Sequence, residues 1–188
     1  ENNKDWFYLR KNNSRMENEN IYTALIYLHH TWLSSSEKNT FTPEELDIYK
    51  ISNKISFRLK SKIDVSRFLE NERNKSQVFR AINSFEFSFI NKLKLILKQD
   101  GDEDSADFNS TLDDILLLGN GRRTQQSFYA LWYFLYDLDY KLLETNKESV
   151  SKELTSLFKA ISNIETKEEF ESKVLQFKDK YSNRDSDE

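Results

Sequence analysis

The chain of 188 residues carries only two histidines, His29 and His30, and they are adjacent. In an α-helix, neighbouring side chains point about 100° apart, so the two rings cannot both face one metal ion. A serine–histidine pair would have to use one of them, and the sequence has no nucleophile-elbow motif. We therefore interpret the histidines as part of a helix interface rather than as a metal site or a general base.

An acidic segment has part of the pattern of a calcium-binding loop. Asp100, Asp102 and Asp104 occupy positions 1, 3 and 5 of an EF-hand loop. Position 6 is Ser105 where the EF-hand needs glycine, and position 12 is Thr111 where it needs a bidentate glutamate. We interpret the segment as a solvated acidic loop without a metal ion.

Neighbouring carboxylates elsewhere lie in the first turns of predicted helices, where the helix dipole stabilises negative charge. The pairs are Glu44–Glu45, Asp113–Asp114 and Glu168–Glu169. No catalytic role is needed to explain them. The sequence also lacks cysteine, which excludes disulfides and thiolate chemistry. We expect no metal, no cofactor and, on balance, no enzymatic activity.

Positive charge is concentrated in the middle of the chain. Residues 50–98 contain twelve Lys and Arg against four Asp and Glu, a net charge of +8, and residues 100–114 contain seven acids and no base. Lys50, Lys54 and Arg58 are spaced four residues apart and would form one stripe on a helix. Such a stripe can bind nucleic-acid phosphates. Alternatively, the acidic loop of the same chain folds against it, or it is solvated.

A second candidate anion site follows the glycines at positions 119 and 121. Two glycines permit a tight turn, and the predicted helix after them offers free N–H groups at its N-terminus. Four residues are candidates to contact an anion there: Arg122, Arg123, Thr124 and Gln125. The alternative is an ordinary turn between helices in which Thr124 is the N-cap.

The most hydrophobic segment predicts a helix over about 124–143. Its apolar face comprises Phe128, Leu131, Trp132, Leu135, Leu138 and Leu142. A second stripe comprises Tyr129, Tyr133, Tyr136 and Tyr140. A helix that is apolar nearly all round normally lies in a core, so we expect this one at the centre of the fold. In the alternative interpretation, the tyrosines form a surface that binds bases or a partner protein.

Helical periodicity continues over most of the remaining chain. It predicts helices over about 17–33, 43–62, 64–69, 75–98, 111–119, 149–162 and 167–181. Thr42, Thr111 and Thr166 are the predicted N-caps of three of them. Only three glycines and one proline occur, too few for the turns of an all-β fold. We predict an all-α, irregular bundle of about seven or eight helices around the helix at 124–143.

The predicted helix at 75–98 has one apolar face, which comprises Val78, Ile82, Phe85, Phe89, Leu93 and Ile96. Within it, Phe85-Glu86-Phe87-Ser88-Phe89 alternates between apolar and polar residues, which is also typical of a strand. The helical periodicity on both sides and the absence of turn residues favour a helix.

We expect residues 1–181 to form one domain and residues 182–188 a polar tail. Since the sequence begins with Glu rather than Met, we interpret it as part of a larger protein. No apolar run approaches the ~20 residues of a membrane span, and no signal-peptide pattern is present, which predicts a cytoplasmic protein. Our hypothesis is a non-enzymatic interaction or regulatory domain that binds another protein or the rest of the parent chain. The alternative is a helical module that binds nucleic acid.

Overall fold

A computed structural model describes residues 17–36, 49–50, 54–55, 62–71, 75–98, 108–116, 123–161, 163–164 and 166–182. These residues confirm the predicted all-α class. The helices are α1 (Glu17–Ser36), α2 (Lys62–Glu70), α3 (Lys75–Phe85), α4 (Asn91–Leu97), α5 (Phe108–Leu116), α6 (Gln125–Leu135), α7 (Tyr140–Ile161) and α8 (Lys167–Tyr181). A π-helical segment, η3 (Glu86–Ile90), joins α3 to α4 without a break. Short strands are described at β1 (Tyr49–Lys50) and β2 (Lys54–Ile55).

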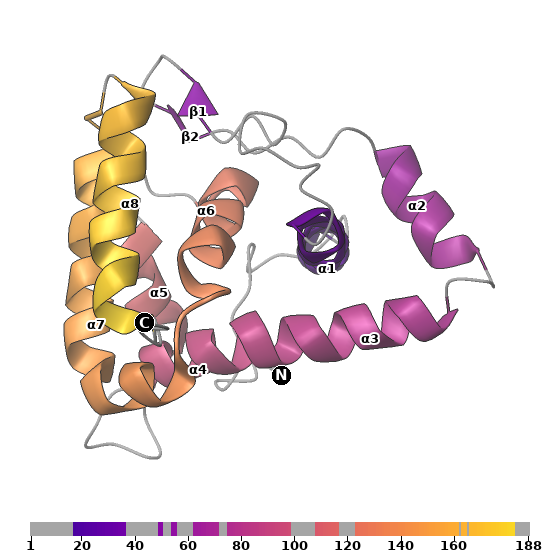
Figure 1. The fold of residues 1–188 in the computed structure, drawn as a ribbon, viewed down its shortest axis with the longest axis horizontal. Coiled ribbons are helices and arrows are strands. Elements are labelled where there is room, and N and C mark those ends of the chain that lie inside the picture. Colours follow the sequence, from indigo (N-terminus) through magenta and orange to yellow (C-terminus); the bar gives the residue numbers. More distant parts are fainter. Residues whose placement is uncertain are drawn as a thin grey trace, which may run out of the picture.

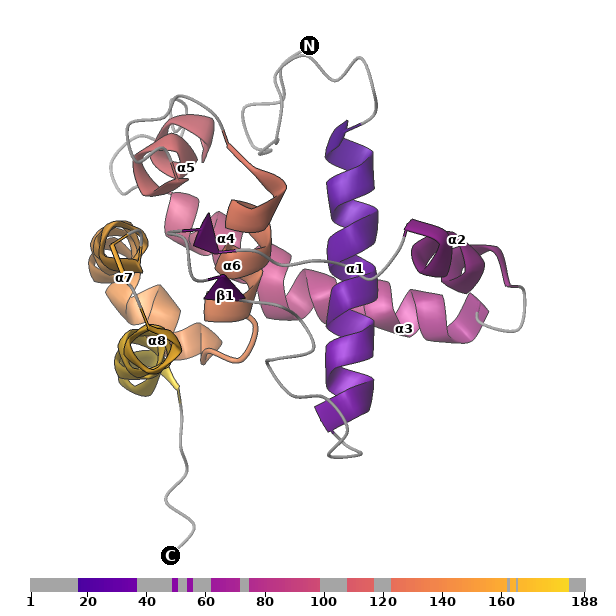
Figure 2. The same ribbon diagram turned by 90° about the horizontal axis from the view of Figure 1, so that it is seen from above.

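The continuous α3–η3–α4 rod connects the two ends of the molecule (Figure 1). At one end α1 runs across α3, and α2 packs beside both (Figure 2). At the other end α4 packs against α5 and α7, and α7 lies side by side with α8. Within the described ranges, no helix combines the length and the apolar character needed to cross a bilayer.

Helix α6 lies at the centre of the core, as its composition predicted. Five of its side chains are completely buried: Ala130, Leu131, Trp132, Phe134 and Leu135. They belong to one contiguous apolar cluster that takes residues from α1, from the α3–η3–α4 rod and from α5 to α8. The burial of these large side chains is the main stabilising contribution that the fold offers.

The predicted helix at 124–143 is interrupted in the structure. The boundaries predicted for it, and for a separate helix at 149–162, were therefore wrong. The first helix ends at Leu135, and α7 begins at Tyr140 and continues to Ile161. The Asp139 carboxylate accepts a hydrogen bond from the Leu142 N–H at 2.9 Å and so caps the new helix. Asn146 departs from helical geometry and kinks α7.

Two further predictions need correction. The helix predicted over 43–62 is replaced at 49–50 and 54–55 by strands, in which Tyr49 pairs with Ile55 and Lys50 with Lys54 in an antiparallel ladder. Aromatic and β-branched residues such as Tyr49 and Ile55 favour a pleated strand. The capping pattern at Thr42 lies outside the described residues. Thr111 is not an N-cap but lies inside α5, because the helix starts earlier, at the buried Phe108.

The remaining capping predictions are confirmed. Thr124 Oγ1 accepts a hydrogen bond from the Ser127 N–H, and Thr166 Oγ1 accepts one from the Glu169 N–H. The alternating segment at 85–89 is helical, as expected, but most of it adopts the wider π-helical turn. A π-turn contains one residue more than an α-turn, so it changes which side chains face outward.

Candidate functional site

Arg123, a predicted anion ligand, is used inside the protein. Its side chain is buried. Nε donates to Asp113 Oδ1 at 2.7 Å, Nη1 donates to Asn109 Oδ1 at 2.8 Å, and Nη2 donates to the Asn109 carbonyl oxygen at 2.6 Å. The guanidinium group therefore links the residue before α6 to α5. Its planar array of N–H groups allows it to bind several acceptors at once, a geometry for which arginine is suited.

The rest of the predicted anion site is only partly described. Thr124 caps α6, and Gln125 is exposed in the first turn of that helix. Arg122 lies outside the described residues. The Arg123 side chain thus binds residues of α5 instead of contributing to an open anion site before α6. Anion binding at this turn stays a prediction.

The basic residues of the predicted stripe do not share a helix. Lys50 and Lys54 are direct partners in the β1–β2 ladder, and β2 lies against α6. Arg58 and the acidic residues 100–107 lie outside the described residues. Whether the acidic loop neutralises these lysines, and whether they bind nucleic acid, therefore stay predictions.

The tyrosine stripe is mostly turned inward. Tyr129 is buried, and Tyr133, Tyr136 and Tyr140 are half-buried. Burial raises the pKa of Tyr129 and of Tyr133 to about 12, and a nearby carboxylate at Asp137 adds to the shift for Tyr133. These phenols therefore remain neutral at physiological pH.

Lys178 of α8 contacts both Tyr133 and Tyr136 and the turn after α6. Its Nζ lies 4.4 Å from the ring centroid of Tyr133 and 4.6 Å from that of Tyr136. The same Nζ donates to both carboxylate oxygens of Asp137, at 2.8 and 2.9 Å. Burial lowers the pKa of Lys178, and the Asp137 carboxylate partly opposes this effect. Cation–π and ionic contacts of this kind stabilise the packing of α8 on α6.

Lys92 of α4 is a second buried lysine. Only 4% of it is exposed. Its Nζ donates to the carbonyl oxygens of Leu135 and Tyr136, at 3.2 and 2.9 Å. The ammonium group thus satisfies carbonyls at the C-terminal end of α6, where the helix dipole favours a cation. Burial lowers its pKa to about 8, although Asp137 and Asp139 oppose the shift.

His29 is buried at the junction of α1, α3 and α6. Its Nδ1 accepts a hydrogen bond from Trp132 Nε1 at 3.2 Å. The proton therefore resides on Nε2, which donates to Ser84 Oγ at 2.9 Å. Burial lowers the pKa of His29 to about 4, so the ring is neutral. His30 instead stacks on Phe68 with ring centroids 4.6 Å apart. The two rings face different partners, in agreement with an interface role.

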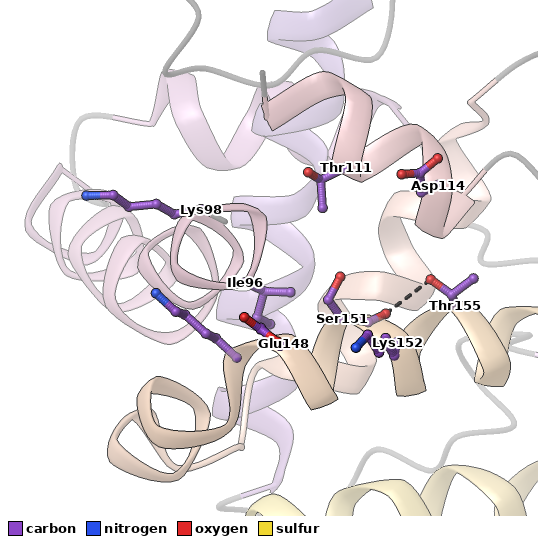
Figure 3. Close-up of a pocket in the computed structure, with 9 residues that line it drawn as sticks. Ile96, Lys98, Thr111, Asp114, Glu148, Ser151, Lys152 and Thr155 are labelled. Atoms are coloured by element: carbon purple, nitrogen blue, oxygen red, sulfur yellow. Dashed lines mark hydrogen bonds between the residues drawn. The ribbon is translucent and has the colours of Figure 1, made fainter. Parts of the chain in front are cut away.

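A cavity of about 340 Å³ opens between α4, α5 and α7 (Figure 3). Its wall contains Ile96, Lys98, Thr111, Asp114, Lys147, Glu148, Ser151, Lys152 and Thr155. The Thr155 hydroxyl donates to the Ser151 carbonyl oxygen at 3.1 Å. Three lysines and two carboxylates give this wall mixed charge. Among the described residues that line it, no nucleophile meets an imidazole or thiolate.

The outer side of the α3–η3 rod exposes large apolar side chains. Phe79 is 67% exposed, Phe87 65% and Ile82 36%. The polar residues Asn83 and Glu86 are exposed on the same side. We call this surface, with Arg80 and Lys75 at its edge, the α3–η3 face. The opposite side of the rod is buried, and there Ala81 and Phe85 lie where α1 packs.

Sequence reasoning missed this surface. It placed Ile82 on the buried face of the predicted helix, whereas Ile82 lies at the border of the exposed one. The available signal was that Phe79 and Phe87 fall outside the buried stripe of that helix. Two large aromatic residues on the polar side of an amphipathic helix indicate a surface with a partner.

Comparison of the chain with protein-family models, with curated proteins and with solved structures gave no match.

Proposed function

We propose that this chain is a non-enzymatic interaction domain that binds an amphipathic helix of a protein partner on its α3–η3 face. The observation that supports this proposal is the exposure of two phenylalanines, each to about two thirds, on one side of a helical rod. Single exposed aliphatic residues are common on proteins, whereas two largely exposed phenylalanines on one side of a helix are informative.

The size of the exposed aromatic surface favours a reversible interaction. A fully covered phenylalanine buries on the order of 200 Å², so covering the exposed two thirds of Phe79 and Phe87 removes roughly 250 Å² from water. At ~25 cal/mol per Å² this contributes about 6 kcal/mol before the cost of association, which is itself about 4–15 kcal/mol. The partner's own apolar surface must supply the rest, so we expect a dissociation constant in the micromolar range.

The charges along the face define the partner's chemistry. Lys75 and Arg80 lie in α3, toward the N-terminal end of the face, and Glu86 lies at the start of η3, nearer the other end of the face. A matching helix therefore has an apolar stripe, acidic residues that come to lie over Lys75 and Arg80, and a basic residue over Glu86.

Three buried ionisable side chains form hydrogen bonds within the protein. His29, Lys92 and Arg123 all direct their polar atoms toward groups inside the fold. In the part of the chain that the structure describes, no three His, Asp or Glu side chains converge in a way that could hold a metal ion.

A designed peptide tests the proposal. The probe is a fluorescent helix of about 18 residues, five turns, with a leucine stripe, glutamates near one end and lysines near the other. We expect fluorescence anisotropy to show binding to the wild type, and about tenfold weaker binding to a Phe79→Ser/Phe87→Ser variant. The matched control is Leu175→Ser, which changes an exposed apolar residue of α8.

Two results would contradict the proposal. One is the absence of binding at chain concentrations up to about 1 mM, far above the micromolar dissociation constant that we expect. The other is binding that the double variant and the Leu175→Ser control affect equally. Circular dichroism and the melting temperature of each variant establish that the fold is retained.

A further inference from the structure

The α3–η3 face is arranged symmetrically about Asn83. Phe79 lies four residues before Asn83 and Phe87 four residues after it. The two phenylalanines are also almost equally exposed, 67% and 65%. Within the face, the charges on the two sides of Asn83 are opposite, with Lys75 and Arg80 before it and Glu86 after it. A surface of this kind is complementary to itself when it is turned end to end.

We infer that the partner of the α3–η3 face is a second copy of this chain, which packs on it antiparallel across a two-fold axis near Asn83. This inference rests on the proposed function. In a two-fold interface, if residue i contacts residue j of the partner, then j contacts i of the partner. Here Phe79 of each copy meets Phe87 of the other, and the arrangement yields two equivalent aromatic contacts.

The π-turn gives the face its symmetry. In a continuous α-helix, a residue eight positions further along is displaced by about 80° around the axis. Because a π-turn contains more residues per turn, η3 reduces this displacement between Phe79 and Phe87. The turn therefore aligns Phe87 with Phe79 while Phe85 and Phe89 stay buried.

Charge selects the antiparallel orientation. In an antiparallel pair, Lys75 and Arg80 of one copy lie over the end that carries Glu86 of the other, which is favourable. A parallel pair would place like charges together. Arg80 Nε also donates to the Ser76 carbonyl oxygen of its own helix, so its guanidinium group stays at the edge of the face.

Asn83 is suited to the position on the axis. Its side-chain amide is both donor and acceptor, so two copies can pair with each other. A single polar asparagine within an apolar helix interface fixes the register and orientation of the pair. An interface built on one helix pair is smaller than the ~1,600 Å² of a standard complex. We therefore expect a weak dimer, half associated at about 10–100 µM chain.

Sedimentation equilibrium over a concentration series tests the inference with designed charge variants. We expect the wild type to be monomeric at about 1 µM and largely dimeric at about 300 µM. A Glu86→Lys chain has an entirely basic face, and a Lys75→Glu/Arg80→Glu chain an entirely acidic one, so each should dimerise about tenfold more weakly alone. An equimolar mixture of the two should restore association as a heterodimer.

A cross-link provides a second readout, because the chain has no cysteine of its own. Asn83→Cys should form an intermolecular disulfide on mild oxidation at about 100 µM chain, since helices in contact 8–10 Å apart bring facing Cα atoms within reach of a disulfide. The control is Leu175→Cys, an exposed position on α8, which should remain largely uncross-linked.

The outcomes separate this inference from the proposed function. A wild-type chain that is monomeric at every concentration but binds the designed peptide would overturn self-association and leave the proposed function standing. A dimer that survives Phe79→Ser/Phe87→Ser, or a mixture of charge variants that stays monomeric, would also overturn the inference. So would a monomer whose melting temperature falls in the double variant, because the face would then be covered within its own chain.

Discussion

Replacing Lys92 with methionine tests whether a charged lysine is buried against the end of α6. Met retains most of the aliphatic stem but removes the ammonium group that binds the Leu135 and Tyr136 carbonyl oxygens. At neutral pH the variant loses two hydrogen bonds. The Leu135 carbonyl oxygen keeps the Leu138 N–H as a donor, so the main cost is the Tyr136 carbonyl left unpaired, about 1–3 kcal/mol. It also loses the unfavourable burial of a charge, so the two effects oppose each other. The pH dependence separates them.

The folded protein releases the Lys92 proton at a pKa of about 8, whereas the unfolded chain keeps it up to the ordinary value of 10.5. Between these values the unfolded state binds more protons, so the free energy of unfolding rises with pH. From pH 7 to 9.5 this contribution amounts to about 2 kcal/mol. Above pH 10 the buried tyrosines reverse the trend, because their pKa values are raised in the folded state.

Urea unfolding at intervals between pH 7 and 9.5 provides the measurement. We expect the difference in unfolding free energy between wild type and Lys92→Met to grow by about 2 kcal/mol across this range. Lys98→Met, a change at an exposed lysine directly after α4, should follow the wild type. Equal pH slopes for wild type and Lys92→Met would refute this prediction, because they would show that Lys92 is not held as a buried cation.

Three further substitutions probe the interior. His29 has a pKa of about 4 in the folded protein against an ordinary 6.5. The wild type should therefore lose about 2 kcal/mol of stability between pH 7.5 and 5 relative to His29→Asn, and parallel urea curves at both pH values would argue against this. Arg123→Met should lower the unfolding free energy by about 2–4 kcal/mol, and an effect as small as that of the exposed Arg67→Met would refute the clamp between α5 and α6. Asp139→Ala should lower the unfolding free energy by about 1 kcal/mol, because it removes the cap of α7. Asp139→Asn keeps a hydrogen-bond acceptor and should lower it by less. Equal losses of stability in thermal unfolding would contradict the capping role.

Local patterns predicted the parts of the fold that depend on local physics. The helical periodicity located α1, the long rod and α8, and the side-chain caps at Thr124 and Thr166 were confirmed. The burial of α6 followed from its composition. Each of these features depends on residues within a few positions of one another, which is the range over which sequence patterns carry information.

The break after Leu135 could not be predicted in this way, because no glycine or proline marks it. After the break, Lys92 donates to the Tyr136 carbonyl oxygen and shares the Leu135 carbonyl oxygen with the Leu138 N–H, and Lys92 lies more than 40 residues earlier in the chain. In the same way, Arg123 resembled an anion ligand because its actual partners, Asn109 and Asp113, are contributed by another helix. Such distant partners become visible only in the folded structure.

The hydrogen bond between the last turn of α8 and the turn after α6 bears on how the chain folds. The Asp139 N–H donates to the Tyr181 carbonyl oxygen at 2.8 Å, and Lys178 of the same helix binds Asp137. During synthesis the turn between α6 and α7 therefore emerges about 40 residues before the groups of α8 that bind it. The turn can reach its final conformation only after α8 has been made and has packed against it. Stopping the chain before Lys178 should leave that corner frayed, with faster hydrogen exchange at Asp139 than at residues inside α6.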